Sequence, residues 1–344
     1  MFEYIRGINY YIVFLFFLLC CSESDKTRRD RFFLLGIKGI DTGDYLQAVG
    51  YFNKALEVDA DFALAYNNRG IAQYNLNKVP EAIQDYNQAI LIMPDYYECI
   101  GNRAFAYEQI NRLKSSLDDW SLLVSTFPDS ADLYLSKGAV ESRLKLFPNA
   151  ENTLKYLLSI DPSNDEAMTN LGILNFQNKK YEKSKKWLAK AIKINPLNGH
   201  AYNALNQLYL DLDQLDVAMQ YVDTALQVMP NYPVFLNNRG LTYLFMDSLD
   251  QGIADINRSI LIDSKNVWSF RNKGIYYLLK KEYPMAIKYF NNVLDTDATV
   301  EDTWGYLGMA YKQSGYPDKA CEYWQQGSYK EDRLSKTYYK VHCR

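Results

Sequence analysis

A small residue recurs at a spacing of 34 residues in this chain, at eight of nine successive places. Counted from Gly36, the register holds glycine at seven of nine places, and the other two places hold alanine and asparagine. The nine residues are Gly36, Gly70, Ala104, Gly138, Gly172, Asn206, Gly240, Gly274 and Gly308. Twelve residues further on, a second series is small throughout: Ala48, Ala82, Ser116, Ala150, Ser184, Ala218, Gly252, Ala286 and Ala320. Two small positions at one fixed period, with no insertion, predict a tandem repeat over most of the 344 residues.

The repeated unit is best explained by two helices that cross closely. Only glycine, alanine or serine at both fixed positions leaves room for the backbones to approach. Apolar residues follow helical spacing in the second half of a unit, as in Ala82, Ile83, Tyr86, Ala89 and Ile90. A single unit of this kind cannot bury its apolar face, so neighbouring units have to stack on one another.

The pattern resembles the tetratricopeptide repeat, with prolines closing units two to six: Pro94, Pro128, Pro162, Pro196 and Pro230. The resemblance covers residues 29–334 as nine repeats and implies an all-α fold, a right-handed α-solenoid of about nine helix-turn-helix units. Ser264 and Ala298 depart from it, because they stand where proline is expected. Residues 335–344 are too few for a tenth unit and are predicted to form a C-terminal cap.

The first 20 residues differ from the repeats. Arg6 precedes an apolar run from Tyr10 to Leu19, which is too short to span a bilayer comfortably but suits the apolar core of a secretory signal. The run stops at Cys20 and Cys21, and this arrangement resembles a bacterial lipoprotein signal in which the cysteine receives the lipid. Cys21 fits this resemblance better than Cys20, because the small residue Cys20 comes before it. An ordinary cleaved signal and an uncleaved anchor remain alternatives.

The lipoprotein resemblance also implies a location. Residues 1–20 would be the signal peptide and residues 21–28 a linker. Ser22 follows the candidate cysteine where aspartate marks inner-membrane retention in well-studied envelopes, so the resemblance implies the outer membrane. Glu23 and Asp25 leave the surface face open as well as the periplasmic face.

Arginine directly precedes the Gly36-series residue (Gly70, Ala104 and Gly240) in three units, at position 7 when each unit is numbered from one. Position 23 of the same unit then holds aspartate, which gives the pairs Arg69 with Asp85, Arg103 with Asp119, and Arg239 with Asp255. Where position 7 is leucine, position 23 is aromatic instead. The exchange predicts an ion pair between the two helices of a unit, worth about 0.2–1 kcal/mol when partly exposed.

Asparagine stands at position 6 in five of nine units, as Asn68, Asn102, Asn170, Asn238 and Asn272. Asparagine is a poor helix former, so its recurrence needs a reason. By resemblance, the first helices line the concave surface, and a similar row holds peptide backbones in the glycosyltransferase that modifies nuclear proteins with N-acetylglucosamine. The five asparagines are therefore predicted to bind peptide, because an amide both donates and accepts hydrogen bonds. A purely structural role, bonding a neighbouring helix, is the alternative.

Further residues expected to line the groove of the concave surface lie at positions 5, 9, 12 and 13 of several units. They include Asn67, Tyr74, Asn75, Asn237, Phe245, Leu278 and Leu279. The alternative is a surface that binds nothing and only spaces two ends.

Two cysteines lie near the C-terminus, at Cys321 and Cys343. Their midpoint is residue 332, where a turn between two antiparallel helices would bring them together, and an exported protein meets an oxidising compartment. The sequence predicts a disulfide that fixes the cap, provided the two Cα atoms lie within about 7 Å. Two separate core cysteines are the alternative, and Cys99 is expected to be a buried small residue.

The composition offers little material for catalysis. The chain has two histidines and a net charge of −3, and it contains no recognisable metal, nucleotide or nucleophile motif. We therefore expect no metal, no cofactor, no nucleic-acid partner and no enzymatic activity. The sequence predicts a lipid-anchored scaffold of a bacterial envelope that binds a peptide or protein partner. A structural spacer, or a regulatory subunit of an envelope enzyme complex, is the alternative.

Overall fold

The computed structural model describes residues 24–343, and every element in that range is an α-helix. The helices are α2 (Asp25–Asp41), α3 (Tyr45–Val58), α4 (Ala63–Asn75), α5 (Val79–Ile92), α6 (Tyr97–Gln109), α7 (Leu113–Thr126), α8 (Ala131–Arg143), α9 (Phe147–Ile160), α10 (Asp165–Gln177), α11 (Tyr181–Ile194), α12 (Gly199–Asp211), α13 (Leu215–Val228), α14 (Pro233–Phe245), α15 (Leu249–Ile262), α16 (Val267–Leu279), α17 (Tyr283–Thr296), α18 (Thr303–Gln313), α19 (Pro317–Tyr329) and α20 (Arg333–His342).

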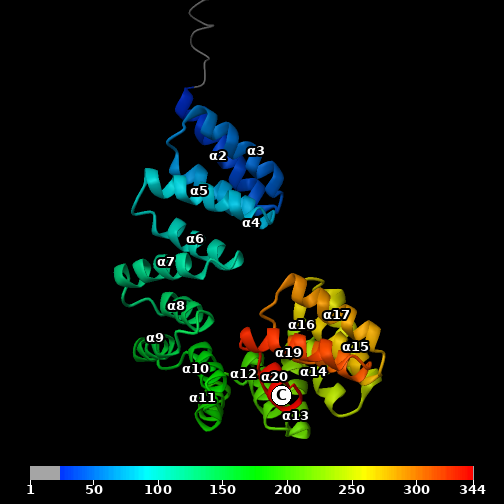
Figure 1. The fold of residues 1–344 in the computed structure, drawn as a ribbon. Helices are drawn as coiled ribbons and strands as arrows, with labels where there is room; N and C mark the ends of the chain where they lie inside the picture. Colours follow the sequence, from blue (N-terminus) through cyan, green and yellow to red (C-terminus); the bar gives the residue numbers. More distant parts are fainter. Residues whose placement is uncertain (1–23, 344) are drawn as a thin grey trace, which may run out of the picture. The chain divides into compact units, whose positions relative to one another are not determined.

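The chain forms two compact units, which meet in sequence at Asp161 and Pro162. The N-terminal unit contains α2 to α9, and the C-terminal unit contains α10 to α20. Within each unit, a leading helix packs on the trailing helix that follows it, and each pair stacks on the next pair (Figure 1). The predicted all-α solenoid of helix pairs is therefore confirmed.

The small residues of the register lie where the two helices of a pair cross. A Cβ atom placed on Gly70 would lie 2.6 Å from the ring of Tyr86, and one on Gly172 would lie 2.5 Å from Leu188. Close-packed interiors do not tolerate such overlap. Asn206, the one large residue of this register, is fully buried and donates a hydrogen bond of 3.0 Å to the carbonyl oxygen of Ala218 on the facing helix.

Each helix pair turns at one residue in a left-handed conformation, at position 15 of every unit. The values of φ lie between 56° and 88°. These residues are Gly43, Asn77, Asn111, Lys145, Lys179, Asp213, Asp247, Lys281 and Gly315. A left-handed residue ends a helix and reverses the chain within a few positions, so every unit keeps the same length and the same turn.

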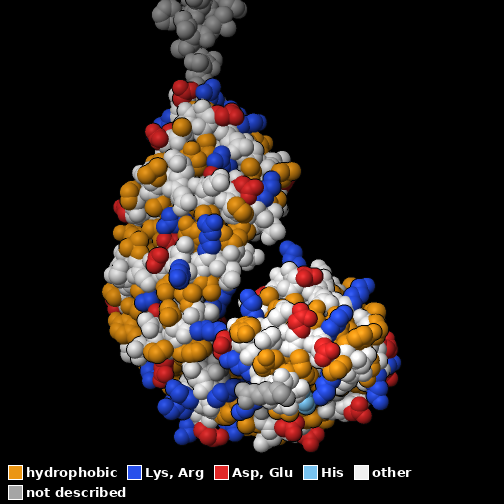
Figure 2. All heavy atoms as spheres, in the orientation of Figure 1, with side chains coloured by type: hydrophobic (Ala, Val, Ile, Leu, Met, Phe, Trp, Pro, Cys, Tyr) orange, Lys and Arg blue, Asp and Glu red, His pale blue; other side chains and the backbone are white. Residues whose placement is uncertain are grey.

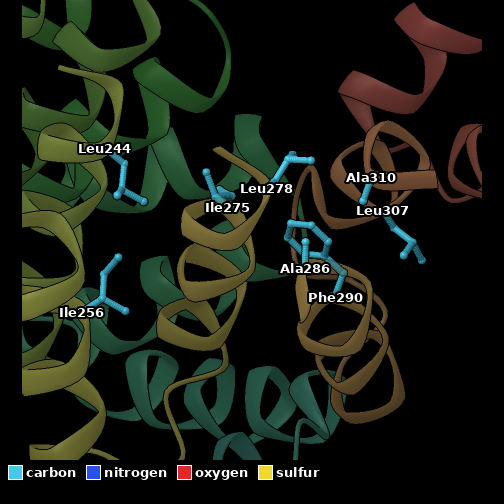
Figure 3. Packing of buried hydrophobic residues seen from close by; sticks show 8 residues of the cluster. All are labelled: Leu244, Ile256, Ile275, Leu278, Ala286, Phe290, Leu307 and Ala310. Atoms are coloured by element: carbon cyan, nitrogen blue, oxygen red, sulfur yellow. The ribbon is translucent and has the colours of Figure 1, made fainter. Parts of the chain in front are cut away.

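Core clusters within each unit extend from one helix pair to the next. In the C-terminal unit, one cluster joins Leu244 of α14, Ile275 of α16, Phe290 of α17 and Leu307 of α18 (Figure 3). Each pair therefore buries its apolar side chains against its neighbours, as expected of a repeat whose stability is a sum over nearest neighbours.

The leading helices lie on the inner side of each stack. Successive leading helices pack against each other at α2 and α4, α4 and α6, α10 and α12, α12 and α14, α14 and α16, and α16 and α18. No two successive trailing helices among the described residues pack as closely. Each stack consequently curves toward its leading helices.

Two predicted boundaries need correction. Helix α2 begins at Asp25, inside the segment 21–28 that was expected to be a linker, because Ser24 caps its first turn by accepting a hydrogen bond from the backbone N–H of Thr27. Helix α20 begins at Arg333, two residues before the predicted cap. In residues 24–343, no helix combines the length and the apolar character that a membrane crossing requires.

Candidate functional site

The arginines at position 7 join three helices. Two nitrogens of Arg69 donate to the carboxylate of Asp85 at 2.7 and 2.5 Å, and Nη1 donates to Oδ1 of Asn53, on the trailing helix of the preceding pair, at 2.7 Å. Burial alone would lower the pKa of Arg69, but the hydrogen bonds to Asp85 outweigh it and raise that pKa. The predicted ion pair is confirmed, and it also fixes one pair of helices to the next.

The other two arginines repeat this geometry. Arg103 bonds Asp119 and reaches back to Asn87, and Arg239 bonds Asp255 and reaches back to Asp223. The contact with the preceding pair was not predicted from the sequence. The signal that could have found it is a polar residue at position 25 of each preceding unit.

Three of the position-6 asparagines bond the preceding leading helix. Nδ2 of Asn272 donates to Oδ1 of Asn237 at 2.9 Å. The same bond joins Asn238 to Asn203 at 2.8 Å and Asn102 to Asn67 at 3.1 Å. In each case position 5 of the preceding unit supplies the acceptor, so these amides connect consecutive units.

Asn68 differs because the preceding unit has Phe33 at position 5, which offers no acceptor. Its Nδ2 donates instead to the carbonyl oxygen of Leu64 in its own helix, at 2.8 Å. An asparagine at position 6 therefore bonds the preceding leading helix where position 5 of the preceding unit offers an acceptor, and bonds its own helix where it does not.

The predicted peptide-binding row needs correction at its C-terminal end. Asn272 is fully buried and Asn238 is 8% exposed, so neither presents its amide to a ligand. Both residues instead have the purely structural role, in which the amide bonds a neighbouring helix. Asn68, Asn102 and Asn170 are half-buried, and peptide binding by these three stays a prediction.

Arg271 places a buried charge at position 5 of the eighth unit. The Arg271 guanidinium donates twice to Oδ1 of Asn272, at 3.0 and 2.8 Å, and to the carbonyl oxygen of Glu301 at 3.1 Å. It also lies 4.8 Å from the ring centroid of Trp268. Because the site is buried, the pKa of Arg271 is lowered from its usual value. Neutral oxygens and an aromatic ring therefore hold this charge, and its donors are directed inward.

Exposed apolar side chains gather at both ends of two neighbouring leading helices. Val234 and Trp268, at position 2 of α14 and α16, are 38% and 39% exposed. Phe245 and Leu279, at position 13 of the same helices, are 40% and 43% exposed. We call these four residues the apolar leading-helix face. All four are uncharged, so the face is suited to an apolar segment of a partner.

The C-terminal helix is held at three points. Cys321 of α19 and Cys343 form a disulfide with Cα atoms 5.6 Å apart, within the limit set for the predicted pair. The guanidinium of Arg333 donates to Asp211 of α12 at 2.8 Å and to Asp302 at 2.9 Å. The start and the end of α20 are therefore both fixed to other helices of the C-terminal unit.

Asp211 collects three donors from distant parts of that unit. Besides Arg333, it accepts from Nζ of Lys179 at 2.8 Å and from the hydroxyl of Tyr181 at 2.5 Å. Burial would raise the pKa of Asp211, but the hydrogen bonds from Lys179 and Tyr181 outweigh it and lower that pKa. The carboxylate therefore stays charged and organises the turn between α10 and α11.

Family models for the tetratricopeptide repeat match two stretches of the chain, residues 63–96 and 145–208. The chain contains tetratricopeptide repeats. The first matched stretch is the second unit of the predicted 34-residue register, and the second stretch begins inside the fourth unit and ends inside the sixth. No curated protein matches the chain by sequence.

Solved structures share the fold at low sequence identity. A tetratricopeptide repeat protein from Parabacteroides merdae is 17% identical with a TM-score of 0.67, and the match covers 72% of this chain and 98% of that one. The APC/C hetero-tetramer Cut9–Hcn1 is 14% identical with a TM-score of 0.59, covering 94% and 78%. The human IFIT1 dimer with m7Gppp-AAAA is 18% identical with a TM-score of 0.57, covering 79% and 69%. At such identities the likeness concerns the fold alone.

The groove candidates divide according to their position in the tetratricopeptide repeat. Phe245 and Leu279, at position 13, are exposed as a ligand contact requires. Asn67, Asn237 and Leu278, at positions 5 and 12, are at most 5% exposed and pack within the stack. Tyr74 is half-buried in the core of the second repeat, and the exposed Asn75 donates to the carbonyl oxygen of Ile71.

The sequence reasoning missed position 2 of the repeats. Val234, Trp268 and also Leu64 of the second repeat are apolar there, whereas Asp30, Glu98, Asp132, Glu166 and Asp302 are acidic. At position 13 only Phe245 and Leu279 are apolar. Repeats seven and eight are therefore the two in which positions 2 and 13 are both apolar, and this combination was a readable signal.

The described residues hold no cluster with the make-up of a metal site. No group of three or more histidine, cysteine, aspartate or glutamate side chains in residues 24–343 could bind a metal ion. His200 packs edge-on against the rings of Tyr232 and Phe235, and burial raises the pKa of the Cys99 thiol to about 12. The predicted lipidation site at Cys21 or Cys20 lies outside the described residues.

Proposed function

We propose that this chain is a non-enzymatic scaffold protein of a bacterial cell envelope, attached by a lipid at Cys21 (or Cys20). It binds a peptide or protein partner on the inner side of its leading helices. Tetratricopeptide repeat proteins generally mediate protein–protein interactions, which supports the binding of a partner. The envelope location and the lipid anchor are proposed from the N-terminal sequence.

The observation that carries the binding proposal is the apolar leading-helix face. A structural spacer would need only a polar inner side, because nothing has to bind there. Trp268 and Phe245 instead remain about two-fifths exposed on the inner side. Large aromatic side chains in such positions are typical binding anchors, since they bury much area at a small entropic cost.

The spacing of this face suggests the size of the bound segment. Positions 2 and 13 are separated by 11 residues on one helix, which corresponds to about 16 Å at the helical rise. An extended segment of roughly five residues spans that length. We propose that the partner presents apolar side chains at both ends of such a segment.

Variants of the face test the binding. Membrane complexes of the anchored protein would be purified, and the partner that is recovered would then be titrated against the purified full chain. We expect the double change Phe245→Ala and Leu279→Ala to weaken its affinity by roughly 30-fold, which corresponds to about 2 kcal/mol. Leu261→Ala is the matched control, because Leu261 is 85% exposed on a trailing helix. A partner that binds equally well to both variants would contradict the proposed surface.

The lipid anchor rests on the order of Arg6, the apolar run and the two cysteines. Metabolic labelling with a palmitate analogue tests it. We expect label in the wild type and in Cys20→Ser but not in Cys21→Ser. Label lost only in Cys20→Ser would move the site by one residue, and an unlabelled wild type would end the lipoprotein proposal.

A regulatory subunit of an envelope enzyme complex is the alternative function, and the same purification separates it. Recovery of a single enzyme whose activity changes on binding would favour that alternative over a general scaffold.

A further inference from the structure

One trailing helix of the C-terminal unit differs from all others in charge. Helix α11 carries five lysines and one glutamate, in the sequence YEKSKKWLAKAIKI. The other trailing helices α3, α5, α7, α9, α13, α15, α17 and α19 carry at most one lysine or arginine each. The whole chain has a net charge of −3, so the excess of positive charge on α11 is local.

The lysines of α11 form a stripe on its solvent side. Lys183, Lys186, Lys190 and Lys193 are all exposed, while the opposite side buries Ser184, Leu188 and Ala191. At 100° per residue, the four lysines fall within an arc of roughly 80°. Lys and Arg side chains gather where α11 lies, at the lower left of the C-terminal unit in Figure 2.

Little negative charge within the unit compensates this stripe. The only acidic residue of α11, Glu182, accepts from Nζ of Lys185 at 3.0 Å, so it is already paired. Lys183, Lys186 and Lys193 form no ion pair with any residue from 24 to 343, and Lys190 lies 4.4 Å from the ring centroid of Trp187. Four positive charges on one helix side therefore face solvent together.

Apolar side chains continue the stripe at the end of the helix. Ile194, the last residue of the helix, lies about 20° beyond the lysine arc and is 49% exposed, and Leu197, in the turn that follows, is 72% exposed. A basic stripe that ends in exposed apolar residues has the composition of a surface that lies on a membrane.

The turn that carries Leu197 is held firmly. Oδ1 of Asn195 accepts from the backbone N–H of Leu197 at 3.0 Å, and Nδ2 of Asn195 donates to Asp165 at 3.0 Å. Asn198, on the other side, donates to Asp165 at 2.7 Å and to Thr169 at 3.0 Å. These bonds fix the backbone on both sides of Leu197, so ordering this turn costs little further backbone entropy on binding.

We infer that the α11 stripe binds the anionic headgroups of a lipid bilayer, with Ile194 and Leu197 entering the headgroup region. Lysines attract an anionic membrane surface over about one Debye length, and the apolar pair adds contact once the helix is close. A lipid surface is favoured over an acidic protein because the charges form a straight row on the exposed side of one helix. The inference goes beyond partner binding, and it concerns the opposite helix of the repeat.

A photo-crosslinking experiment on the full chain tests the inference. A benzophenone amino acid replaces Leu197, and the protein is added to vesicles of phosphatidylcholine alone or with phosphatidylglycerol. We expect lipid adducts at residue 197 to be roughly tenfold more abundant on the anionic vesicles and to fall steeply at high salt. The same probe at Leu261, which is 85% exposed on α15, should give few adducts on either vesicle.

Charge variants separate the stripe from general electrostatics. Changing Lys183, Lys186, Lys190 and Lys193 together to glutamine should abolish the difference between the two vesicles. The matched control changes Lys54, Lys114, Lys155 and Lys288 to glutamine, which removes the same charge from four other trailing helices, and it should leave the difference intact. All eight lysines are exposed, so both variants are expected to fold, and circular dichroism checks this.

Three outcomes would overturn the inference. Equal yields of lipid adduct on neutral and anionic vesicles would show that charge does not drive binding. An equal yield with the probe at position 261 would show that binding is not specific to α11. Adducts to an acidic protein rather than to lipid, in cells that express the probe-bearing chain, would replace the membrane with a protein partner. Palmitate labelling reports the anchor separately, so failure of the stripe and failure of the anchor are distinguishable.

Discussion

The guanidinium of Arg333 donates to Oδ1 of Asp211 at 2.8 Å, although 122 residues separate the two in the chain. Arg333 opens the last helix of the C-terminal unit, and Asp211 closes α12 in the sixth repeat. The repeats of this unit therefore do not contact only their sequence neighbours, and a polar clasp joins its cap to its second helix pair.

This clasp predicts a pH-dependent contribution to stability. Because folding lowers the pKa of Asp211, its interactions contribute above the ordinary carboxyl pKa of about 3.9 and are lost as the pH falls through the lower folded value. We expect Asp211→Asn to lower the free energy of unfolding by about 1–2 kcal/mol at pH 7 and by progressively less below pH 4. Urea unfolding at several pH values measures this. Asp213→Asn, on an exposed neighbour, is the control, and an Asp211→Asn effect that does not change with pH would contradict the prediction.

Loss of the ion pair of the second repeat should destabilise the protein, and a second substitution should restore the stability. Arg69→Leu leaves Asp85, which is 5% exposed, without its cation, so we expect a loss of about 2–4 kcal/mol. Adding Asp85→Tyr should recover most of that loss, because the first repeat already pairs Leu35 with Tyr51 at these positions. Denaturant midpoints of the wild type, Arg69→Leu and the double variant measure the stability that is lost and regained. A double variant that is no more stable than Arg69→Leu alone would show that the pairs are not interchangeable.

The asparagines at one register position predict unequal costs. Asn272 is fully buried and accepts from Arg271, so Asn272→Ala leaves a buried guanidinium short of an acceptor and should cost about 2–3 kcal/mol. Asn68→Ala at the same position removes only a bond within its own helix and should cost about 0.5 kcal/mol or less. Thermal unfolding compares the two, and equal costs would argue against the unit-to-unit role of Asn272.

The disulfide predicts a local effect of reduction. The bond closes a loop with a sequence separation of 22 residues, for which the chain-entropy estimate is about 3 kcal/mol. We expect a dithiol reductant, or Cys343→Ser, to speed hydrogen exchange in α20 while α14 to α17 keep their protection. Exchange followed by mass spectrometry measures this, with Cys99→Ser as the variant that leaves the disulfide in place. Faster exchange throughout the C-terminal unit would mean that α20 is not the part that the bond stabilises.

The sequence by itself determined the repeat. The small residues at two places of every unit fixed where the helices cross, and the exchange of Arg69 and Asp85 for Leu35 and Tyr51 fixed which side chains face each other within a unit. These relations hold inside one helix pair, where 3.6 residues per turn and a short turn leave few alternatives. The placing of Cys321 opposite Cys343 followed from the same local geometry.

Only the tertiary structure decided what happens between units. The offset at which one pair stacks on the next brings Asn272 onto Asn237, and this encloses an asparagine that the sequence suggested for binding. The same stacking leaves Trp268 and Phe245 exposed at the two ends of the leading helices, and it brings Arg333 back to Asp211. A period of 34 residues states that the units are alike but not how they are rotated against each other, and that rotation selects which polar groups are buried and which apolar groups are left for a partner.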